Sequence, residues 1–423
     1  MTIRRTLVLT PVLVVLLAAC GGDDDDGPPA ADAGAPDAGG VHGVIQDRYG
    51  QPRAGVHVGA IGHSGTLTAD DGTFALPDVH PPYDLAVFDD SPTGTRRVLV
   101  YAGLTRLDPG IRVPGGPYED RTRHADVSLA VHLASPYLSA EQGLSGIVDV
   151  PFGGVAGGAG VDPDASEGTW FPTAMWSGGS SAELAALVVQ ARFGTADVPG
   201  DLLGAGFTHF TVTDGQPATG SIDVGPVIVG VVPVSVDSDE VLSWTLGLHK
   251  TGTTLVGYFA TVGAGATSLP APAGPDYDLD VRLSGSDWSY ERAGLHAGDP
   301  LVVTPRHAVA LLAPDENATV PATQEFSWAA FGPGFHTFSF STASAPEGLR
   351  LSVFTTATEY TLPDLSVVGV TLPTGACQWG VGARSDYASI DDFATLGATI
   401  GFEPPDGERY VGAGTARMVT VQP

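Results

Sequence analysis

Residues 41–87, VHGVIQDRYGQPRAGVHVGAIGHSGTLTADDGTFALPDVHPPYDLAV, decide the fold predicted for this chain. Apolar and small residues recur at every second position in four short runs, the pattern of half-buried strands. The recurring residues are Val41, Gly43 and Ile45; Val56, Val58 and Ala60; Phe74 and Leu76; and Tyr83, Leu85 and Val87. Residues 47–50 and 70–72 each end in glycine and supply the positive φ of tight turns. We therefore expect a small, self-contained β-sandwich with no catalytic residues.

The spacing of glycines and apolar residues in this stretch resembles the carboxypeptidase regulatory-like domain. The matching residues are Gly43, Ile45, Asp47, Gly50, Pro52, Gly55, Val56, Val58, Thr68, Gly72, Phe74, Leu76, Tyr83 and Leu85. The resemblance implies a transthyretin-like sandwich with a carbohydrate-binding-like fold, an accessory domain rather than a peptidase. Where the family has Asp after the Thr of its second turn, this chain has Ala69, with Asp70 and Asp71 following. We expect the hydrogen bond that closes this turn to be rearranged.

The N-terminal residues have the pattern of an export signal. Arg4 and Arg5 precede an apolar run at residues 7–17, which is too short to span a bilayer. Residues 17–20, Leu-Ala-Ala-Cys, resemble a bacterial lipoprotein lipobox, which implies removal of residues 1–19 and acylation of Cys20. The alternative is a chance cysteine after a small-residue cleavage site. The resemblance implies attachment to a membrane through the lipid.

Two further features bear on localisation. Gly21, rather than Asp, follows the cysteine, which in lipoproteins sorted by this position implies the outer membrane of a Gram-negative bacterium. Residues 20–40 contain no large apolar side chain, so we expect a disordered acidic tether there.

The charge balance excludes one class of partner. The formal net charge of the 423 residues is −29, and Lys250 is the only lysine. Such a surface repels phosphate backbones, so we expect no nucleic-acid partner. Cys20 and Cys377 are the only cysteines, so the acylated chain has no internal disulfide.

The whole chain is predicted to be all-β, a string of three or four β-sandwich modules after the signal peptide and tether. The first module covers residues 41–115, and a β-rich module of unknown family follows at 116–225. A third sandwich at 226–310 is a candidate degenerate copy of the first, because Leu269-Pro270 precedes Tyr277 much as Leu76-Pro77 precedes Tyr83.

The last module, residues 311–423, resembles a fibronectin type III-like, immunoglobulin-type sandwich. Trp328 is expected to point inward from an early strand, and Cys377 to be a small buried core residue. Residues 181–192, SAELAALVVQAR, are the best helix candidate in the chain, although residues 187–192 also suit a strand.

The common catalytic signatures are missing from the sequence. There is no His-Glu-x-x-His zinc motif, no Walker loop and no dinucleotide fingerprint, and residues 62–66 end in Thr where a nucleophile elbow needs Gly. His57 and His63 form the only near pair of histidines within one module, and we interpret them as exposed or turn residues rather than metal ligands. The chain is therefore predicted to have no enzymatic activity and no cofactor, with calcium the one ion to consider.

Two sets of candidate site residues remain. Clustered carboxylates suit calcium, although solvated acidic turns are the favoured interpretation; they are Asp237, Asp239, Asp276, Asp278 and Asp280. Clustered aromatic residues could stack on sugars or anchor an interface, although core packing is favoured; they are Trp170, Phe171, Trp176, Trp288 and Tyr290.

Our preferred hypothesis is a non-catalytic, lipid-anchored cell-envelope protein that presents β-sandwich modules as a binding or spacer surface. Its expected partners are the membrane, and a polysaccharide or another envelope protein. One alternative is a carbohydrate-binding module array. The other is an enzyme of unrecognised type within residues 120–310.

Overall fold

The computed structural model confirms the all-β prediction. It describes residues 40–47, 50–90, 96–113, 123–138, 142–149, 155–157, 161–162, 164–176, 179–192, 201–238, 243–251, 256–263, 267–342, 348–396, 408–412 and 416–422. The predicted signal peptide, Cys20 and nearly all of the tether lie outside these residues. Within them, no helix is long and apolar enough to cross a membrane.

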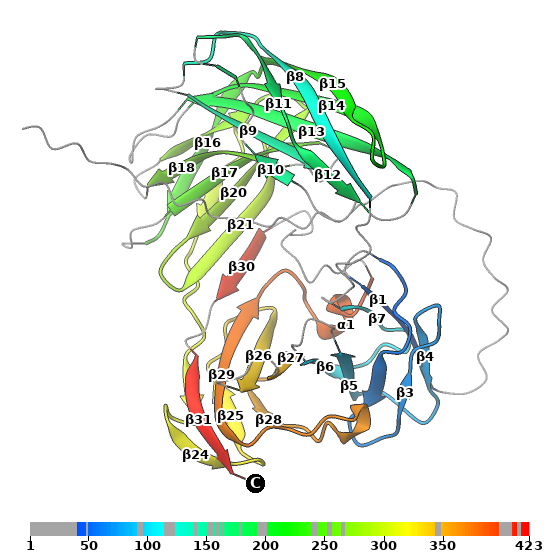
Figure 1. The fold of residues 1–423 in the computed structure, drawn as a ribbon. Coiled ribbons are helices and arrows are strands. Elements are labelled where there is room, and N and C mark those ends of the chain that lie inside the picture. The colour runs from blue at the N-terminus through cyan, green and yellow to red at the C-terminus, as the bar shows by residue number, and fades with distance from the viewer. Residues whose placement is uncertain are drawn as a thin grey trace, which may run out of the picture.

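The first seven strands form two facing sheets, and we call them the first copy (Figure 1). In the small sheet, β1 (Val41–Asp47) is antiparallel to β4 (Thr73–Leu76) and parallel to β7 (Gly110–Val113). The large sheet runs in the order β3 (Gly65–Leu67), β2 (His57–Ala60), β5 (Tyr83–Asp90), β6 (Arg96–Leu104). The alternating residues of 41–87 point between these sheets, as the period-two pattern predicts.

The same strand order recurs in residues 229–303, which we call the third copy. Here β16 (Val229–Val236) is antiparallel to β19 (Ser268–Pro272) and parallel to β22 (Leu301–Val303). Its large sheet runs β18 (Val256–Gly263), β17 (Ser243–Lys250), β20 (Tyr277–Ser284), β21 (Trp288–Leu295). Each strand takes the place of its counterpart in β1 to β7.

The second copy, residues 123–226, repeats this order with one strand split. In its small sheet β8 (Arg123–Leu133) is antiparallel to β11 (Glu167–Trp170) and β12 (Thr173–Trp176) and parallel to β15 (Ala218–Pro226). Its large sheet runs β10 (Val155–Gly157), β9 (Gln142–Asp149), β13 (Ser181–Arg192), β14 (Leu202–Thr213). The chain thus builds one seven-strand arrangement three times.

The C-terminal module begins at residue 311. One sheet contains β23 (Leu311–Ala313), β25 (Glu325–Trp328) and β28 (Glu359–Thr361). The other contains β24 (Ala318–Pro321), β26 (Phe335–Thr342), β27 (Leu349–Thr355), β29 (Gly375–Arg384), β30 (Glu408–Gly412) and β31 (Arg417–Gln422). The short helices are η2 (Ser366–Val368) and α1 (Ile390–Phe393). Trp328 and Cys377 are buried between the two sheets, which confirms both expectations.

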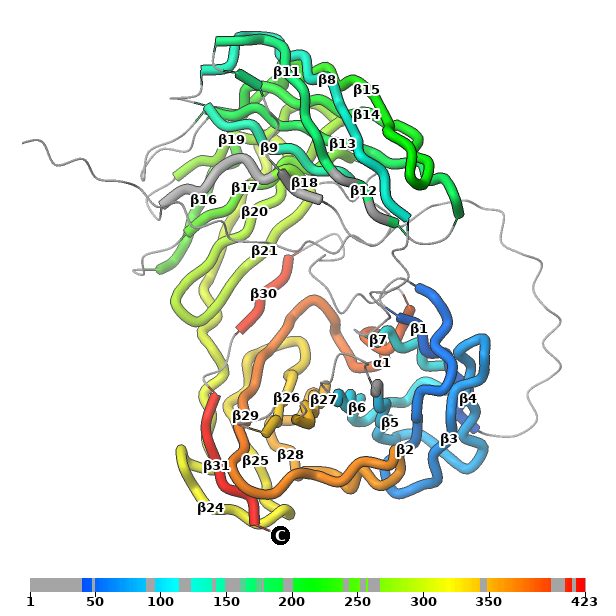
Figure 2. Tube along the Cα trace, in the orientation of Figure 1, coloured from blue at the N-terminus to red at the C-terminus, as the bar shows by residue number. Residues whose placement is uncertain are grey.

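The C-terminal module continues the large sheets of two other modules. β27 pairs in parallel with β6, from Leu349 opposite Arg96 to Phe354 opposite Tyr101. At the far end of the same sheet, β30 lies between β29 and β21 of the third copy. The blue first copy and the orange C-terminal module therefore lie side by side (Figure 2). The expectation of a self-contained first sandwich is wrong, because β6 is an edge strand whose backbone is completed by β27.

The helix considered for residues 181–192 is wrong, because this segment is the strand β13. Its inward residues, Ala186 and Val188 among them, lie in the core of the second copy. Its other face, with Leu187 and Val189, packs against Leu248 of the third copy. A strand buried on both faces has no polar alternation, and this is why its sequence resembles a helix.

The turn at Ala69 is closed by its neighbours. The Asp71 carboxylate accepts hydrogen bonds from the backbone nitrogen of Thr73 at 3.0 Å and from its hydroxyl at 2.6 Å. The Thr68 hydroxyl accepts one from the backbone nitrogen of Val56 at 2.9 Å and links the turn to the residue just before β2. The displaced aspartate thus supplies the rearranged hydrogen bond that we expected.

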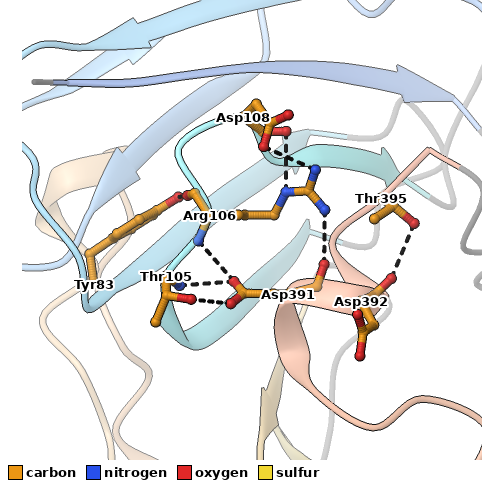
Figure 3. Close-up of polar contacts among 7 residues, drawn as sticks. All are labelled: Tyr83, Thr105, Arg106, Asp108, Asp391, Asp392 and Thr395. Atoms are coloured by element: carbon orange, nitrogen blue, oxygen red, sulfur yellow. Dashed lines mark hydrogen bonds and ion pairs between the residues drawn. The ribbon is translucent and has the colours of Figure 1, made fainter.

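Helix α1 is fastened to the first copy by a set of polar contacts (Figure 3). The Asp391 carboxylate accepts hydrogen bonds from the backbone nitrogens of Thr105 at 2.8 Å and Arg106 at 3.0 Å, and from the Thr105 hydroxyl. The Arg106 guanidinium donates in return to the backbone carbonyl of Asp391 at 2.9 Å. Burial raises the pKa of Asp391, but these hydrogen bonds and the charge of Arg106 outweigh it, so the pKa is lowered.

We expect Asp391→Ala to reduce the free energy of unfolding by about 1–3 kcal/mol, because it removes the hydrogen bonds that a charged carboxylate accepts from Thr105 and Arg106. The folded state lowers the pKa of Asp391, so its contribution is present above the ordinary pKa of about 3.8 and is lost as the pH falls through the folded value. Urea unfolding of the variant and the wild type at pH 7 and pH 3 measures both effects.

Asp108→Ala is the matched control for this substitution. Asp108 pairs with the same Arg106 at 3.0 Å, but its side chain is 81% exposed. Exposed ion pairs contribute about 0.2–1 kcal/mol, so this variant should stay close to wild type. Equal losses in the two variants would contradict the role assigned to Asp391.

Candidate functional site

Most of the clustered aromatic residues are core residues. Trp170, Trp176, Trp288 and Tyr290 are buried, whereas Phe171 is 73% exposed. The two tryptophans of the second copy lie on β11 and β12 and turn toward its core. Both faces of a buried ring are covered by protein, so these four cannot form a stacking platform in this arrangement. This corrects the ligand alternative and agrees with the core interpretation.

The carboxylates considered for calcium form no metal site among those that the structure describes. Asp239 lies outside the described residues, and Asp237 is exposed just after β16. Among the residues that the structure describes, no three His, Cys, Asp or Glu side chains are placed to hold a metal ion. His57 and His63 are both exposed, as expected.

Two of these aspartates instead meet two histidines in the third copy. Asp278 on β20 is the cross-strand partner of His249 on β17, with 3.8 Å between Oδ2 and the His249 Nδ1. His296, just after β21, places its Nε2 2.9 Å from the Asp278 Oδ1. We call His249, Asp278, Asp280 and His296 the third-copy cluster. Its two aspartates, Asp278 and Asp280, are among the carboxylates that the sequence analysis considered for calcium.

Asp280 gives the third-copy cluster its chemical character. Burial raises the pKa of its carboxyl to about 6, and the charge of His249 lowers it only in part. The backbone nitrogen of Gly294 donates to its Oδ1 at 3.4 Å. A carboxyl with a pKa raised in this way can take up and release a proton in mildly acidic conditions.

A second charged group, which sequence reasoning missed, lies where the third copy meets the C-terminal module. The Glu291 carboxylate contacts the Arg282 Nε at 2.6 Å and the Arg409 Nη2 at 2.5 Å. Both Glu291 and Arg409 are buried. Their strands, β21 and β30, pair with each other although about 120 residues of sequence separate them. No local sequence pattern predicts such a pairing. This group joins two modules.

We expect Asp280→Asn to make the protein more stable at pH 7.5, by up to about 3 kcal/mol for a pKa shift of this size. The folded state raises the pKa of Asp280 to about 6, so the native protein binds more protons than the unfolded chain between about pH 4 and 6. Stability therefore falls as the pH rises through this window, and the substitution removes that loss.

Thermal unfolding midpoints at pH 5 and pH 7.5 measure this effect. The variant should exceed the wild type by more at pH 7.5 than at pH 5. Asp276→Asn is the control, because this side chain is 77% exposed beside Lys250 and should shift neither midpoint. An identical gain at both pH values would show that burial of the Asp280 charge is not its cause.

Comparisons with known proteins leave the family open. No family model and no curated protein matches this chain. Among solved structures, the Bacillus anthracis TIE protein is 9% identical over 87% of this chain and 65% of its own, with a TM-score of 0.16. The major pilin subunit BcpA of Bacillus cereus is 9% identical over 63% of this chain and 98% of its own, with a TM-score of 0.14.

The pilus adhesin SpaC from Lactobacillus rhamnosus GG is 10% identical, over 79% of this chain and 44% of its own, with a TM-score of 0.12. This chain thus spans about two thirds of the length of the first of these proteins and less than half of the length of the last. TM-scores at this level support no conclusion about function, so the function proposed for this chain rests on its own residues.

Proposed function

We propose that this chain is a non-catalytic, lipid-anchored protein of the bacterial cell envelope that holds a binding surface on a stiff β-sandwich scaffold. The observation that carries the proposal is the continuity between modules. β27 pairs with β6, and β30 pairs with β21, so three of the four modules share one sheet. A protein that only needed flexible reach would not require paired strands at both junctions.

The remaining junction supports the same role. β13 of the second copy packs its outer face onto Leu248 of the third copy, and Lys250 lies over the ring of Phe207 on β14, 5.8 Å from its centroid. Apolar contacts of this kind exclude water and resist bending. The modules are therefore proposed to act as one body, with the second copy farthest along the path from the first copy.

The anchor is proposed from the sequence around Cys20, together with the acidic tether. Attachment through several acyl chains is stable because each buried methylene contributes about 0.8 kcal/mol.

No described residue favours the carbohydrate-binding alternative, since the clustered aromatic rings are buried and Phe171 stands apart. The enzyme alternative has no supporting constellation beyond the third-copy cluster, which lacks a metal site among the described residues.

We expect cells that express the protein to incorporate radiolabelled palmitate into it, and Cys20→Ala to abolish the label because the acylated sulfur is gone. Cys377→Ala should keep the label, since this second cysteine is buried in the C-terminal module. Gel autoradiography of membrane fractions measures the outcome. Unlabelled wild-type protein, or a label that survives Cys20→Ala, would disprove the anchor.

We expect the first and second copies to hold one fixed separation, because the junctions are paired and packed. The measurement is electron-resonance distance spectroscopy between spin labels on Leu67→Cys and Phe171→Cys, two exposed positions, in a Cys20→Ala background. A narrow distance distribution is predicted. Adding Asp391→Ala as a matched control should broaden it. A broad distribution without that substitution would mean a flexible string of modules and would contradict the scaffold proposal.

A further inference from the structure

The outer face of the small sheet in the third copy is largely apolar although it faces solvent, with Ser235 and Ser268 as its polar residues. Strands β16, β19 and β22 contain no charged residue. On this face Val231 is 58% exposed and Val302 is 63% exposed, with Val229 and Pro233 exposed beside them. We call Val229, Val231, Pro233, Pro270 and Val302 the valine face. Contiguous exposed apolar surface on a soluble domain marks an interaction site.

The other two copies show that the fold does not require this composition. The equivalent face of the first copy carries His42, Gln46, Thr73 and Arg112. That of the second copy carries exposed residues of the same polar kind, His124, Asp126, Thr219, Ser221 and Asp223. Three sheets with one topology thus present two polar faces and one apolar face. The apolar face is therefore a feature of the third copy's sequence that the shared topology does not explain.

Prolines decide how a partner could bind there. β19 and β22 are the two edge strands of this sheet, and Pro270 and Pro272 remove two backbone donors from β19. An added strand would find few hydrogen bonds along this edge. A partner on the β19 side therefore contacts the side chains of the face rather than extending the sheet, and β22 offers only three residues on the other side.

The charges around the valine face identify the kind of partner. Asp299 stands three residues before Val302, and Asp237 follows β16, its backbone nitrogen bonded to the Val303 carbonyl at 3.1 Å. A second copy of this chain and anionic lipid both carry net negative charge, so a molecule of net charge −29 repels both. Basic groups at the rim would instead be attracted.

We propose that the valine face is a docking surface for another protein whose contact region has an apolar centre and a basic rim. This proposal deepens the display role proposed above and rests on it. It places the binding function in the third copy, on the side chains of β16 and β22.

The test measures binding of a synthetic peptide of alternating leucine and lysine residues to the full chain. Fluorescence anisotropy of the labelled peptide at 0.15 M salt reports the binding. The wild type should bind it, and Val231→Asp and Val302→Asp should each weaken binding at least about tenfold by removing a buried valine contact. Both substitutions add negative charge, so purely electrostatic binding would be unchanged or tighter. That result would overturn the proposal.

Thr219→Asp is the matched control, since it adds the same charge on β15, the counterpart of β22 in the second copy. It should leave peptide binding and the thermal midpoint unchanged. Unaltered thermal midpoints for the two valine variants separate lost binding from lost folding. If folding is lost, Val231→Ser and Val302→Ser must show the weakened binding.

Two further outcomes would replace the proposed partner. A wild-type dimer in sedimentation that Val231→Asp dissociates would assign the face to a second copy of this chain. Flotation of the Cys20→Ala protein with phosphatidylcholine vesicles, lost in Val302→Asp, would assign it to lipid. Palmitate labelling of the same variants is independent of all these results, so failure of the anchor and failure of the docking surface are distinguishable.

Discussion

Strand pairing at both ends of one sheet is the constraint on which the arrangement of this molecule depends. The sheet of the C-terminal module has two open sides, and β6 and β21 are the counterpart strands of two copies of the same topology. Each open side accepts one of them, β27 in parallel with β6 and β30 antiparallel to β21. An edge that remained open would expose unpaired backbone groups, so each pairing removes an aggregation hazard as it joins two modules.

Side chains then make these pairings specific. Beside β30, the Glu291 carboxylate lies between Arg282 and Arg409, and burial lowers the pKa of Arg409 against the opposing effect of Glu291. Removing water from three charges costs free energy, and well-packed apolar residues in the same place would avoid that cost. Deleting one of the charged partners would destabilise the protein by about 3–5 kcal/mol. Such a group tolerates only one register. On the other side, Gly59 and Gly65 let η2 approach, since a Cβ on Gly65 would lie 2.2 Å from the Val367 carbonyl oxygen.

The sequence predicts what is local and misses what depends on distant partners. Period-two alternation at residues 41–87 and the inward Trp328 followed from short segments, because a strand with one buried face records that face in its own residues. The helix considered for β13 was wrong because this strand has a second buried face, which packs against Leu248 about sixty residues away and leaves no polar alternation in the sequence. The recurrence of one strand order is a property of pairing, and the sequence indicated it only for the third copy, through Leu269-Pro270 before Tyr277.

The same contrast between local features and distant partners applies to the candidate sites. Asp278 and Asp280 drew attention as carboxylates that calcium could use. The histidines that contact Asp278 come from elsewhere in the chain, His249 from β17 and His296 from the segment just after β21. The valine face escaped notice because alternating valines are also what a buried strand requires. Only the comparison of three equivalent sheets distinguishes an apolar face that the fold needs from one that it does not. Internal repetition therefore supplies, within one chain, the reference that a family of related sequences would otherwise provide.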